Sequence, residues 1–289
     1  MDAPLTRVSC EVPLASVDTL FELIDADLFT LTSWNDVETG ESRVDVFLED
    51  AEQAPCVCVA LQKAGETIGL HLIPKCTPLP RSDWAEGWKR FFHVEHISPR
   101  VVVRPSWEAY EAQPGDCVIQ LDPGLSFGTG KHATTQACLR FLDQLAIEDA
   151  DRTVLDMGCG SGILSIAATL LGFRSVQGFD NDPDCIRVSQ ENAELNKVTL
   201  PFYLDDLSHA HGPSEVVVAN ILAPVLIEFA PYVAASVAQD TRARLVLSGI
   251  LDEQYAAVRS AYEAQGFCEV ESLLVETWRS GLFRRVVSV

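Results

Sequence analysis

The sequence lacks a hydrophobic run long enough to cross a membrane. The chain has 289 residues. None of its apolar runs approaches the length of roughly 18 to 20 consecutive residues that a membrane-spanning helix needs. Its first residues, MDAPLTRVSCEVPL, also lack the basic start and apolar core of a signal peptide. These absences predict a cytoplasmic protein that does not bind a membrane.

The cysteines lack the pattern of a disulfide framework or a metal site. There are nine of them, an odd number, scattered along the chain and without a C-x-x-C pair. A disulfide framework is indicated by an even number of cysteines at regular spacings, and a zinc knuckle by C-x-x-C pairs. We therefore expect reduced, mostly buried thiols and no bound metal.

Basic side chains are scarce. The chain has 21 Lys and Arg against 42 Asp and Glu, which gives a net charge of −21. Such a charge repels the phosphate backbone of a nucleic acid and attracts a basic protein. It predicts a protein partner rather than a nucleic-acid substrate, although an acidic surface that serves only solubility explains the same count.

The length is typical of two domains joined by a linker. Residues 1–75 alternate short strand and helix patterns, among them SRVDVFLE and IGLHLIP as strands, and predict a small α+β domain. Residues 76–99 predict a helical linker with an aromatic stripe suited to packing, formed by Trp84, Trp88, Phe91 and Phe92. Residues 100–289 form the third segment.

From residue 153 the chain repeats an apolar strand pattern, a glycine turn and a helix pattern. Short apolar runs that alternate with helices are typical of a mostly parallel sheet with both faces covered. We therefore expect an α/β domain here.

The strongest local motif is the turn VLDMGCGSG, in which Gly158, Gly160 and Gly162 follow a predicted strand. Glycines here let a ligand touch the backbone where the strand ends and a helix begins. Asp180 closes the next strand, where a carboxylate can accept hydrogen bonds from ribose hydroxyls. A turn used only for packing, with Asp180 as a helix cap, is the alternative.

The spacing of these glycines decides between nucleotide ligands. A dinucleotide fold prefers G-x-G-x-x-G, whereas G-x-G-x-G preceded by Asp156 is typical of S-adenosylmethionine-dependent methyltransferases. The segment GTGK at 128–131 is not a phosphate-binding P-loop, because Leu125 and His132 stand where that motif needs Gly and Ser or Thr.

A third motif is the apolar run VVVANIL, which ends at Asn220. Open α/β sheets bind ligands at the carboxyl ends of their strands, and the carbonyl of an amide there can accept a hydrogen bond from an amine. An Asn that only caps the following helix is the alternative.

Together these motifs resemble the ribosomal protein L11 methyltransferase (PrmA) family. The resemblance extends from about Asp83 to the C-terminus and is carried by DPGLSFGTGKHATTQACL, VLDMGCGSGILSIAA, VQGFDNDPDCI, VVVANILAPVLIEFAP and LSGIL. It implies a class I (Rossmann-like) methyltransferase domain, a helical linker, and a ferredoxin-like N-terminal domain that recognises the ribosomal protein. It also implies methylation of lysine side chains and α-amino groups with S-adenosyl-L-methionine.

The resemblance also implies site residues. Asn220 is the expected catalytic residue, which orients the nucleophile. The expected cofactor-binding residues are Thr135, Gly158, Asp180 and Asn220, with Phe127, Gly128, Gly160 and Asp205 as neighbours. His132 is a candidate proton acceptor, and a structural loop histidine is its alternative.

The chain departs from the family motif GTGTHPTT at Lys131 and Ala133. A lysine near a sulfonium and a substrate amine must point outward or pair with a carboxylate. Because residues 1–75 match no motif, the alternatives of a lysine methyltransferase for another protein, such as the electron-transfer flavoprotein β subunit, and of a non-catalytic cofactor-binding module stay open. The sequence does not indicate an oligomeric state.

Overall fold

The structure is a computed structural model that describes residues 5–23, 31–36, 40–48, 50–79, 92–122, 130–209 and 211–286. The chain divides into two compact units, residues 1–91 and 92–289. Trp84, Trp88 and Phe91 of the predicted linker lie outside the described residues. At the two ends of the predicted linker, strand β4 (Lys75–Leu79) pairs within the first unit and strand β5 (Glu95–His96) within the second.

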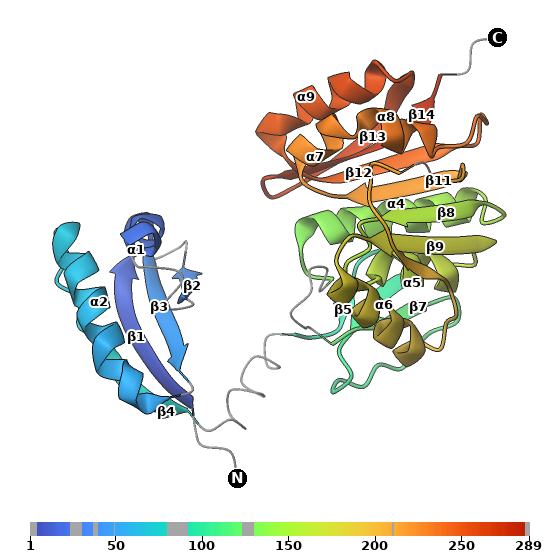
Figure 1. Cartoon of the computed structure of the whole chain (residues 1–289). Helices are drawn as coiled ribbons and strands as arrows, with labels where there is room; N and C mark the ends of the chain where they lie inside the picture. Colours follow the sequence, from blue (N-terminus) through green and yellow to red (C-terminus); the bar gives the residue numbers. More distant parts are fainter. Residues whose placement is uncertain are drawn as a thin grey trace. The chain divides into compact units, whose positions relative to one another are not determined.

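The first unit is a four-stranded antiparallel sheet with two helices, drawn in blue in Figure 1. Its elements follow in the order β1 (Leu5–Pro13), α1 (Val17–Leu23), β2 (Leu31–Asp36), β3 (Glu41–Leu48), α2 (Ala54–Thr67) and β4. The strand order β2-β3-β1-β4 and the βαββαβ chain order are those of a ferredoxin-like domain, as predicted. Short 3-10 turns, Leu14–Ser16 and Ala51–Gln53, precede the two helices.

The core of this unit lies between the sheet and its helices. Alternate strand residues such as Val8 and Val44 point toward buried residues of α2 such as Leu61. The prediction of a strand over IGLHLIP was wrong, because β4 begins only at Lys75. Leu72 instead packs against Gly65, which lacks the Cβ that would collide with it.

The second unit is built on a seven-stranded, mostly parallel sheet, which confirms the predicted α/β class. Its strand order is β10-β9-β8-β11-β12-β14-β13, and only the last two strands run antiparallel to their neighbours. The strands are β8 (Thr153–Met157), β9 (Ser175–Asp180), β10 (Phe202–Leu204), β11 (Val216–Asn220), β12 (Arg244–Leu251), β13 (Phe267–Val275) and β14 (Trp278–Arg285).

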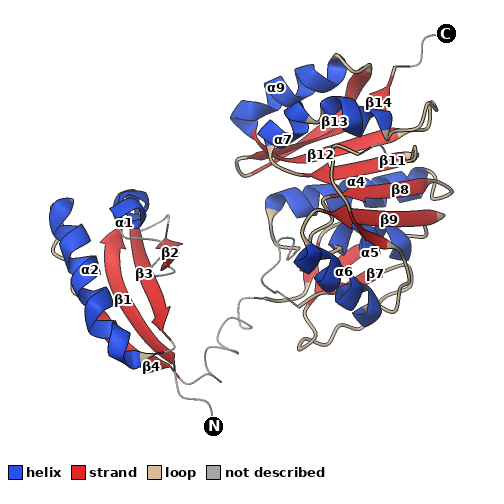
Figure 2. Ribbon diagram, in the orientation of Figure 1, coloured by secondary structure: helices blue, strands red, loops and turns tan. Residues whose placement is uncertain are grey.

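Helices cover both faces of this sheet (Figure 2). On one face lie α4 (Ala133–Glu148), α5 (Ile163–Leu170) and α6 (Pro183–Leu195), and on the other α7 (Ala223–Glu228), α8 (Ala230–Ala235) and α9 (Asp252–Glu263). The sequence of strand β11 is continuously apolar because the strand is buried on both faces. Val216 and Val218 pack into one core and Val217 and Ala219 into the other, so all four are buried.

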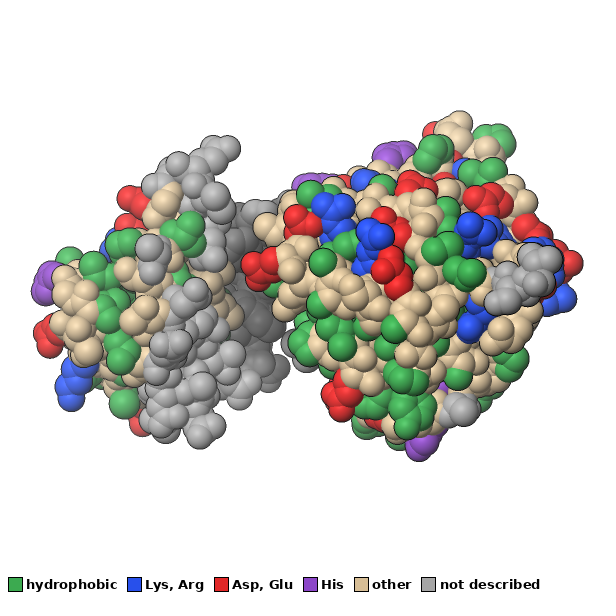
Figure 3. Space-filling view, turned by 90° about the horizontal axis from the view of Figure 1, so that it is seen from above, with side chains coloured by type: hydrophobic (Ala, Val, Ile, Leu, Met, Phe, Trp, Pro, Cys, Tyr) green, Lys and Arg blue, Asp and Glu red, His purple; other side chains and the backbone are tan. Residues whose placement is uncertain are grey.

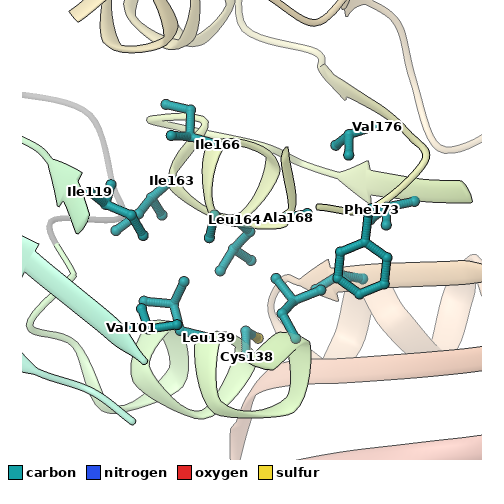
Figure 4. Close-up of a cluster of buried hydrophobic side chains, with 14 of the residues drawn as sticks. Val101, Ile119, Cys138, Leu139, Ile163, Leu164, Ile166, Ala168, Phe173 and Val176 are labelled. Carbon is teal, nitrogen blue, oxygen red and sulfur yellow. The ribbon is translucent and has the colours of Figure 1, made fainter. Parts of the chain in front are cut away.

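A small sheet extends the first of these cores. It consists of β5, β6 (Val101–Arg104) and β7 (Cys117–Gln120). Figure 4 shows Ile119 beside Ile163 of α5, and Val101 beside Leu139 of α4. Among the helices of the described residues, none has the length and apolar character to cross a membrane.

Candidate active site

A cavity of about 730 Å³ opens at the carboxyl ends of the parallel strands. Its wall includes five of the residues predicted for the site, which are Gly158, Gly160, Asp180, Asp205 and Asn220. They come from the ends of β8 to β11, because parallel strands all end at the same edge of a sheet. Phe127 and Gly128, also predicted, lie outside the described residues.

The glycine turn after β8 is held against β9. The N–H groups of Gly158 and Cys159 both donate to the carbonyl of Phe179, each at 2.9 Å. Gly158 and Gly160 have positive φ angles of 69° and 54°, which side chains strain to adopt. A Cβ on Gly158 would also lie 3.2 Å from the side chain of Ile221, across the cavity wall. The turn therefore presents bare backbone to a ligand.

The carboxylate of Asp180 is fixed in this wall. One oxygen accepts the Gly160 N–H at 2.9 Å and the other accepts the Asp182 N–H at 3.1 Å. The residue is only 8% exposed. Asp180 does not cap α6, since Asp182 is the residue whose side chain accepts the Asp184 N–H. The alternative of Asp180 as a helix cap was therefore wrong, and the residue lines the cavity.

Two histidines hold the loop after β10. Nδ1 of His209 contacts the Asp205 carboxylate, which also accepts the Asp206 N–H at 2.8 Å. Both contacts lower the pKa of Asp205, and the contact with His209 has the larger effect. The carboxylate therefore stays ionised. The ring of His211 stacks on Phe179 at 3.9 Å between centroids, and its Nδ1 lies 3.9 Å from Asp205.

Asn220 ends β11 with its side-chain carbonyl oxygen buried and without a hydrogen-bond partner among the described residues. The residue lines the cavity, so this oxygen is an acceptor that a ligand can use. The next residue, Ile221, donates its N–H to Ser248 at 3.0 Å. A Cβ on Gly249 would lie 2.5 Å from the carbonyl oxygen of Ile221, so only glycine permits this approach.

The first turn of α4 reaches the same cavity. His132 caps this helix, with Nδ1 2.7 Å from the Thr134 hydroxyl, and its ring meets Trp278 at 5.0 Å. His132, Thr134 and Trp278 all line the cavity. Thr135 lies behind them, fully buried, and its hydroxyl has no hydrogen-bond partner in the described part of the chain.

Lys131 pairs with a carboxylate of the chain itself. Its Nζ lies 3.6 Å from Glu95 and over the ring of Phe92, at 4.6 Å from the ring centroid. It is not among the residues that line the cavity. Of the two arrangements expected for this lysine, the carboxylate pair is therefore present.

Asp156 supports the turn from behind. One oxygen accepts both the N–H and the hydroxyl of Ser165 in the first turns of α5, at 3.1 and 2.7 Å. Burial raises the pKa of Asp156 to about 6, against these hydrogen bonds. The residue therefore links β8 to α5 across the glycine turn.

Sequence reasoning missed several aromatic residues of the wall. Phe179, Phe229 and Trp278 line the cavity, together with the exposed Leu222. Trp278 starts the antiparallel strand β14 and reaches the cavity only through the fold, so no local motif could have found it. Groups of three or more side chains suited to a metal ion are absent from the described residues.

The cavity fits an S-adenosyl nucleoside. Bare glycine backbone, a carboxylate fixed in the wall and apolar side chains provide the close approach, the hydrogen-bond acceptors and the apolar surface that such a ligand needs. A mostly parallel seven-stranded sheet with this site at its carboxyl edge defines a class I methyltransferase domain.

Comparison with known proteins narrows this class to one family. The model of the family "Ribosomal protein L11 methyltransferase (PrmA)" matches residues 18–285, and the chain belongs to this family. The enzyme class predicted from the motifs, and with it S-adenosylmethionine as cofactor, is thereby confirmed.

Relatives of known name agree. The ribosomal protein L11 methyltransferase of Geobacter metallireducens is 37% identical over 97% of this chain and 96% of its own length. That of Heliobacterium modesticaldum is 41% identical over 72% of this chain and 66% of its own length. The crystal structure of the ribosomal protein L11 methylase from Lactobacillus delbrueckii subsp. bulgaricus aligns with a TM-score of 0.59 and 32% identity, over 67% of this chain and 99% of that one.

Proposed function

We propose that this protein transfers methyl groups from S-adenosylmethionine to amino nitrogens of ribosomal protein L11, on lysine side chains, the α-amino group or both. The observation that carries the proposal is the cavity at the carboxyl edge of the sheet, lined by Asp180 and Asn220, in a chain of the PrmA family. The two Geobacter relatives that match over nearly their whole length are both named ribosomal protein L11 methyltransferase. Neither a different protein substrate nor a non-catalytic role is favoured by them.

The cofactor-binding residues are assigned by their place in the wall. Gly158 and Gly160 would let the cofactor touch the backbone, and Asp180 would accept hydrogen bonds from the ribose. Asp205 would lie toward the adenine, since it directly follows the strand that pairs with Asp180. Thr135 is assigned to the amino-acid end of the cofactor by the family motif alone, because it is fully buried and does not line the cavity.

Phe127 and Gly128 would complete the cofactor site from the loop before α4. Their assignment rests on the family motif alone, because both lie outside the described residues.

Asn220 is assigned to the substrate amine. The bound cofactor supplies an electrophilic methyl group on a positively charged sulfur. A lysine ammonium, with an ordinary pKa of about 10.4, has no lone pair for attack until it loses a proton. The unpartnered carbonyl oxygen of Asn220 can accept an N–H of the neutral amine and so fix the direction of its lone pair. No covalent residue is needed.

Apolar side chains around Asn220 favour the neutral amine. Leu222, Phe229 and Trp278 line the same cavity and limit the access of water. A desolvated amine has a lower pKa than one in water, because burial disfavours the charged form. The walls therefore help to deliver the nucleophile in its reactive state.

The charge of the chain suits a basic protein substrate and not a nucleic acid. The net charge is −21. On the face of the second unit shown in Figure 3, basic side chains lie beside acidic ones. Within the second unit, Arg242 bridges Asp149 and Glu215. We assign the enzyme to the cytoplasm, where ribosomal proteins are made, and leave its oligomeric state open.

The direct test is methylation of purified ribosomal protein L11, followed by mass spectrometry of the intact protein and its peptides. We expect mass increases in steps of one methyl group at amino nitrogens. The Asn220→Ala variant is the matched control, since it should bind cofactor but methylate slowly. Methylation of the electron-transfer flavoprotein β subunit in place of L11 would overturn the assigned substrate.

The N-terminal unit is assigned to substrate recognition. Because the chain divides after residue 91 and each unit has its own core, a chain of residues 92–289 is the appropriate truncation. It should bind cofactor like the full chain and fail to methylate L11. Full activity of the truncated chain on L11 would refute the assignment.

A further inference from the structure

Two thiols in the N-terminal unit lie in direct contact. Sγ of Cys58 is 3.4 Å from Sγ of Cys76, although 18 positions separate the residues in sequence. Among the nine cysteines, all of which lie in described segments, no other pair makes a thiol–thiol hydrogen bond in the described structure. The contact is therefore specific to this pair.

The fold explains why the two side chains meet. Cys76 lies on β4 opposite Val8, whose side chain faces the helices in the core of the unit. Cys58 lies on α2, next to the buried Val57, and packs against the same core. The contact thus joins the helix layer to β4, which among the described strands pairs with β1 alone and lies at the edge of the sheet.

Access differs between the two thiols. Cys76 is exposed, whereas Cys58 is partly buried. An oxidant in solution can therefore reach Cys76 first, and Cys58 is then placed to attack the sulfur of its neighbour. Burial, followed by the hydrogen bond to Cys76, raises the pKa of Cys58 to about 11 in the reduced pair, which lowers its thiolate fraction and leaves Cys76 as the first thiol to react.

We propose that Cys58 and Cys76 form a reversible, oxidation-sensitive modification site, in which a low-molecular-weight disulfide converts the two thiols into an intramolecular disulfide. In the first step the Cys76 thiolate attacks one sulfur of glutathione disulfide, which releases one glutathione thiolate and leaves a mixed disulfide. In the second step the Cys58 thiolate attacks the Cys76 sulfur and releases the second glutathione. The protein loses two protons and two electrons, and glutathione disulfide gains them.

The bond would tie α2 to the edge strand β4. In the described part of the unit, this strand is held to the sheet by its ladder with β1, from Ser9↔Lys75 to Leu5↔Leu79. A covalent link between its second residue and α2 would oppose its detachment. The cofactor cavity lies in the other unit and shares no residue with this pair.

The test uses the full chain, treated with glutathione disulfide and analysed by intact mass and peptide mapping. We expect the loss of two hydrogen atoms, a cross-linked peptide that contains Cys58 and Cys76, and full reversal by dithiothreitol. Cys56→Ser is the matched control, because Cys56 is exposed on the same helix and makes no thiol contact in the described structure. This variant should form the bond as the parent does.

The two single variants decide the outcome. Cys58→Ser should stop at the mixed disulfide, with one glutathione bound to Cys76, and Cys76→Ser should form no cross-link at all. A parent chain that also stops at glutathionylated Cys76, or that cross-links other cysteines, would overturn the proposal. Calorimetric binding of S-adenosylhomocysteine should be equal for the oxidised and reduced chains, which keeps this test separate from that of the methyltransferase function.

Discussion

Replacing Asp180 by alanine tests the assignment of the cofactor site most directly. In the structure its two carboxylate oxygens accept the N–H groups of Gly160 and Asp182, at 2.9 and 3.1 Å, and the residue is 8% exposed at the cavity wall. The ribose of a bound cofactor would meet a carboxylate acceptor that is already fixed in position. Alanine removes this acceptor and leaves the shape of the glycine turn less well held.

The magnitude follows from the kind of hydrogen bond lost. Hydrogen bonds to a charged group contribute about 1.5 to 3 kcal/mol each. Because 1.4 kcal/mol corresponds to a factor of ten, loss of one such bond should weaken cofactor binding roughly 10- to 150-fold. Asp180→Asn should approach the same loss, since both oxygens face backbone N–H groups and one would be replaced by a donor.

Isothermal titration calorimetry with S-adenosylhomocysteine measures this change without turnover. Asp182→Ala is the matched control, because Asp182 caps α6 on the same loop but does not line the cavity. This control should lower stability somewhat and leave the dissociation constant close to that of the parent. A folded Asp180→Ala variant that binds with the affinity of the parent would refute the assignment.

Three further variants probe one residue that lines the cavity, Asn220, and two that support the cavity from behind, His211 and Asp156. Asn220→Ala should lower kcat by roughly 5- to 150-fold, because it removes one hydrogen bond of about 1 to 3 kcal/mol. The cofactor affinity measured by calorimetry should change little. Equal losses in kcat and in cofactor affinity would contradict the role of Asn220. His211→Ala should weaken cofactor binding several-fold and spare kcat at saturation, because it removes the stack on Phe179, and unchanged affinity would contradict this. Asp156→Asn should raise the thermal midpoint at pH 7.5, and unaltered stability would count against a charge penalty there.

The pH dependence of that last variant has a definite sign. Burial raises the pKa of Asp156 from 3.8 to about 6, so the folded state binds its proton more tightly than the unfolded state. The ionised form therefore destabilises the fold above about pH 6, by on the order of 3 kcal/mol at 1.36 kcal/mol per unit. The penalty fades as the pH falls toward 4, and the two thermal midpoints should converge there.

The sheet of the second unit was predictable because its strands are buried on both faces. A strand such as β11 is then apolar at every position, and its alternation with helices indicates a parallel sheet. The order of the strands is not contained in this periodicity, because it depends on contacts between segments that are far apart in the sequence. The false strand at IGLHLIP shows the limit of pattern reading, since Ile68, Leu70 and Leu72 do pack against the core in alternation, but the segment forms no strand.

The predicted site residues that line the cavity share one property, which is their place at the end of a strand or in the turn after it. Asp180 and Asn220 could be found because a polar residue that closes an apolar strand is visible in the sequence. His211 and Trp278 could not, because each meets its partner across long stretches of chain, at Phe179 and His132. Contacts of this kind depend on tertiary packing and leave no local signal.

Gly249 shows how two separate motifs become one site. It lies on β12 with a φ angle of 82°, within the irregularity of pairing between Leu247 and Ile250. Its missing Cβ gives Ile221 the room to pass, and Ile221 is bonded through its N–H to Ser248. The segment LSGIL therefore fixes the backbone that follows Asn220, and with it the direction of the Asn220 side chain. A larger residue at Gly249 would collide with the carbonyl of Ile221 and so displace the proposed amine acceptor.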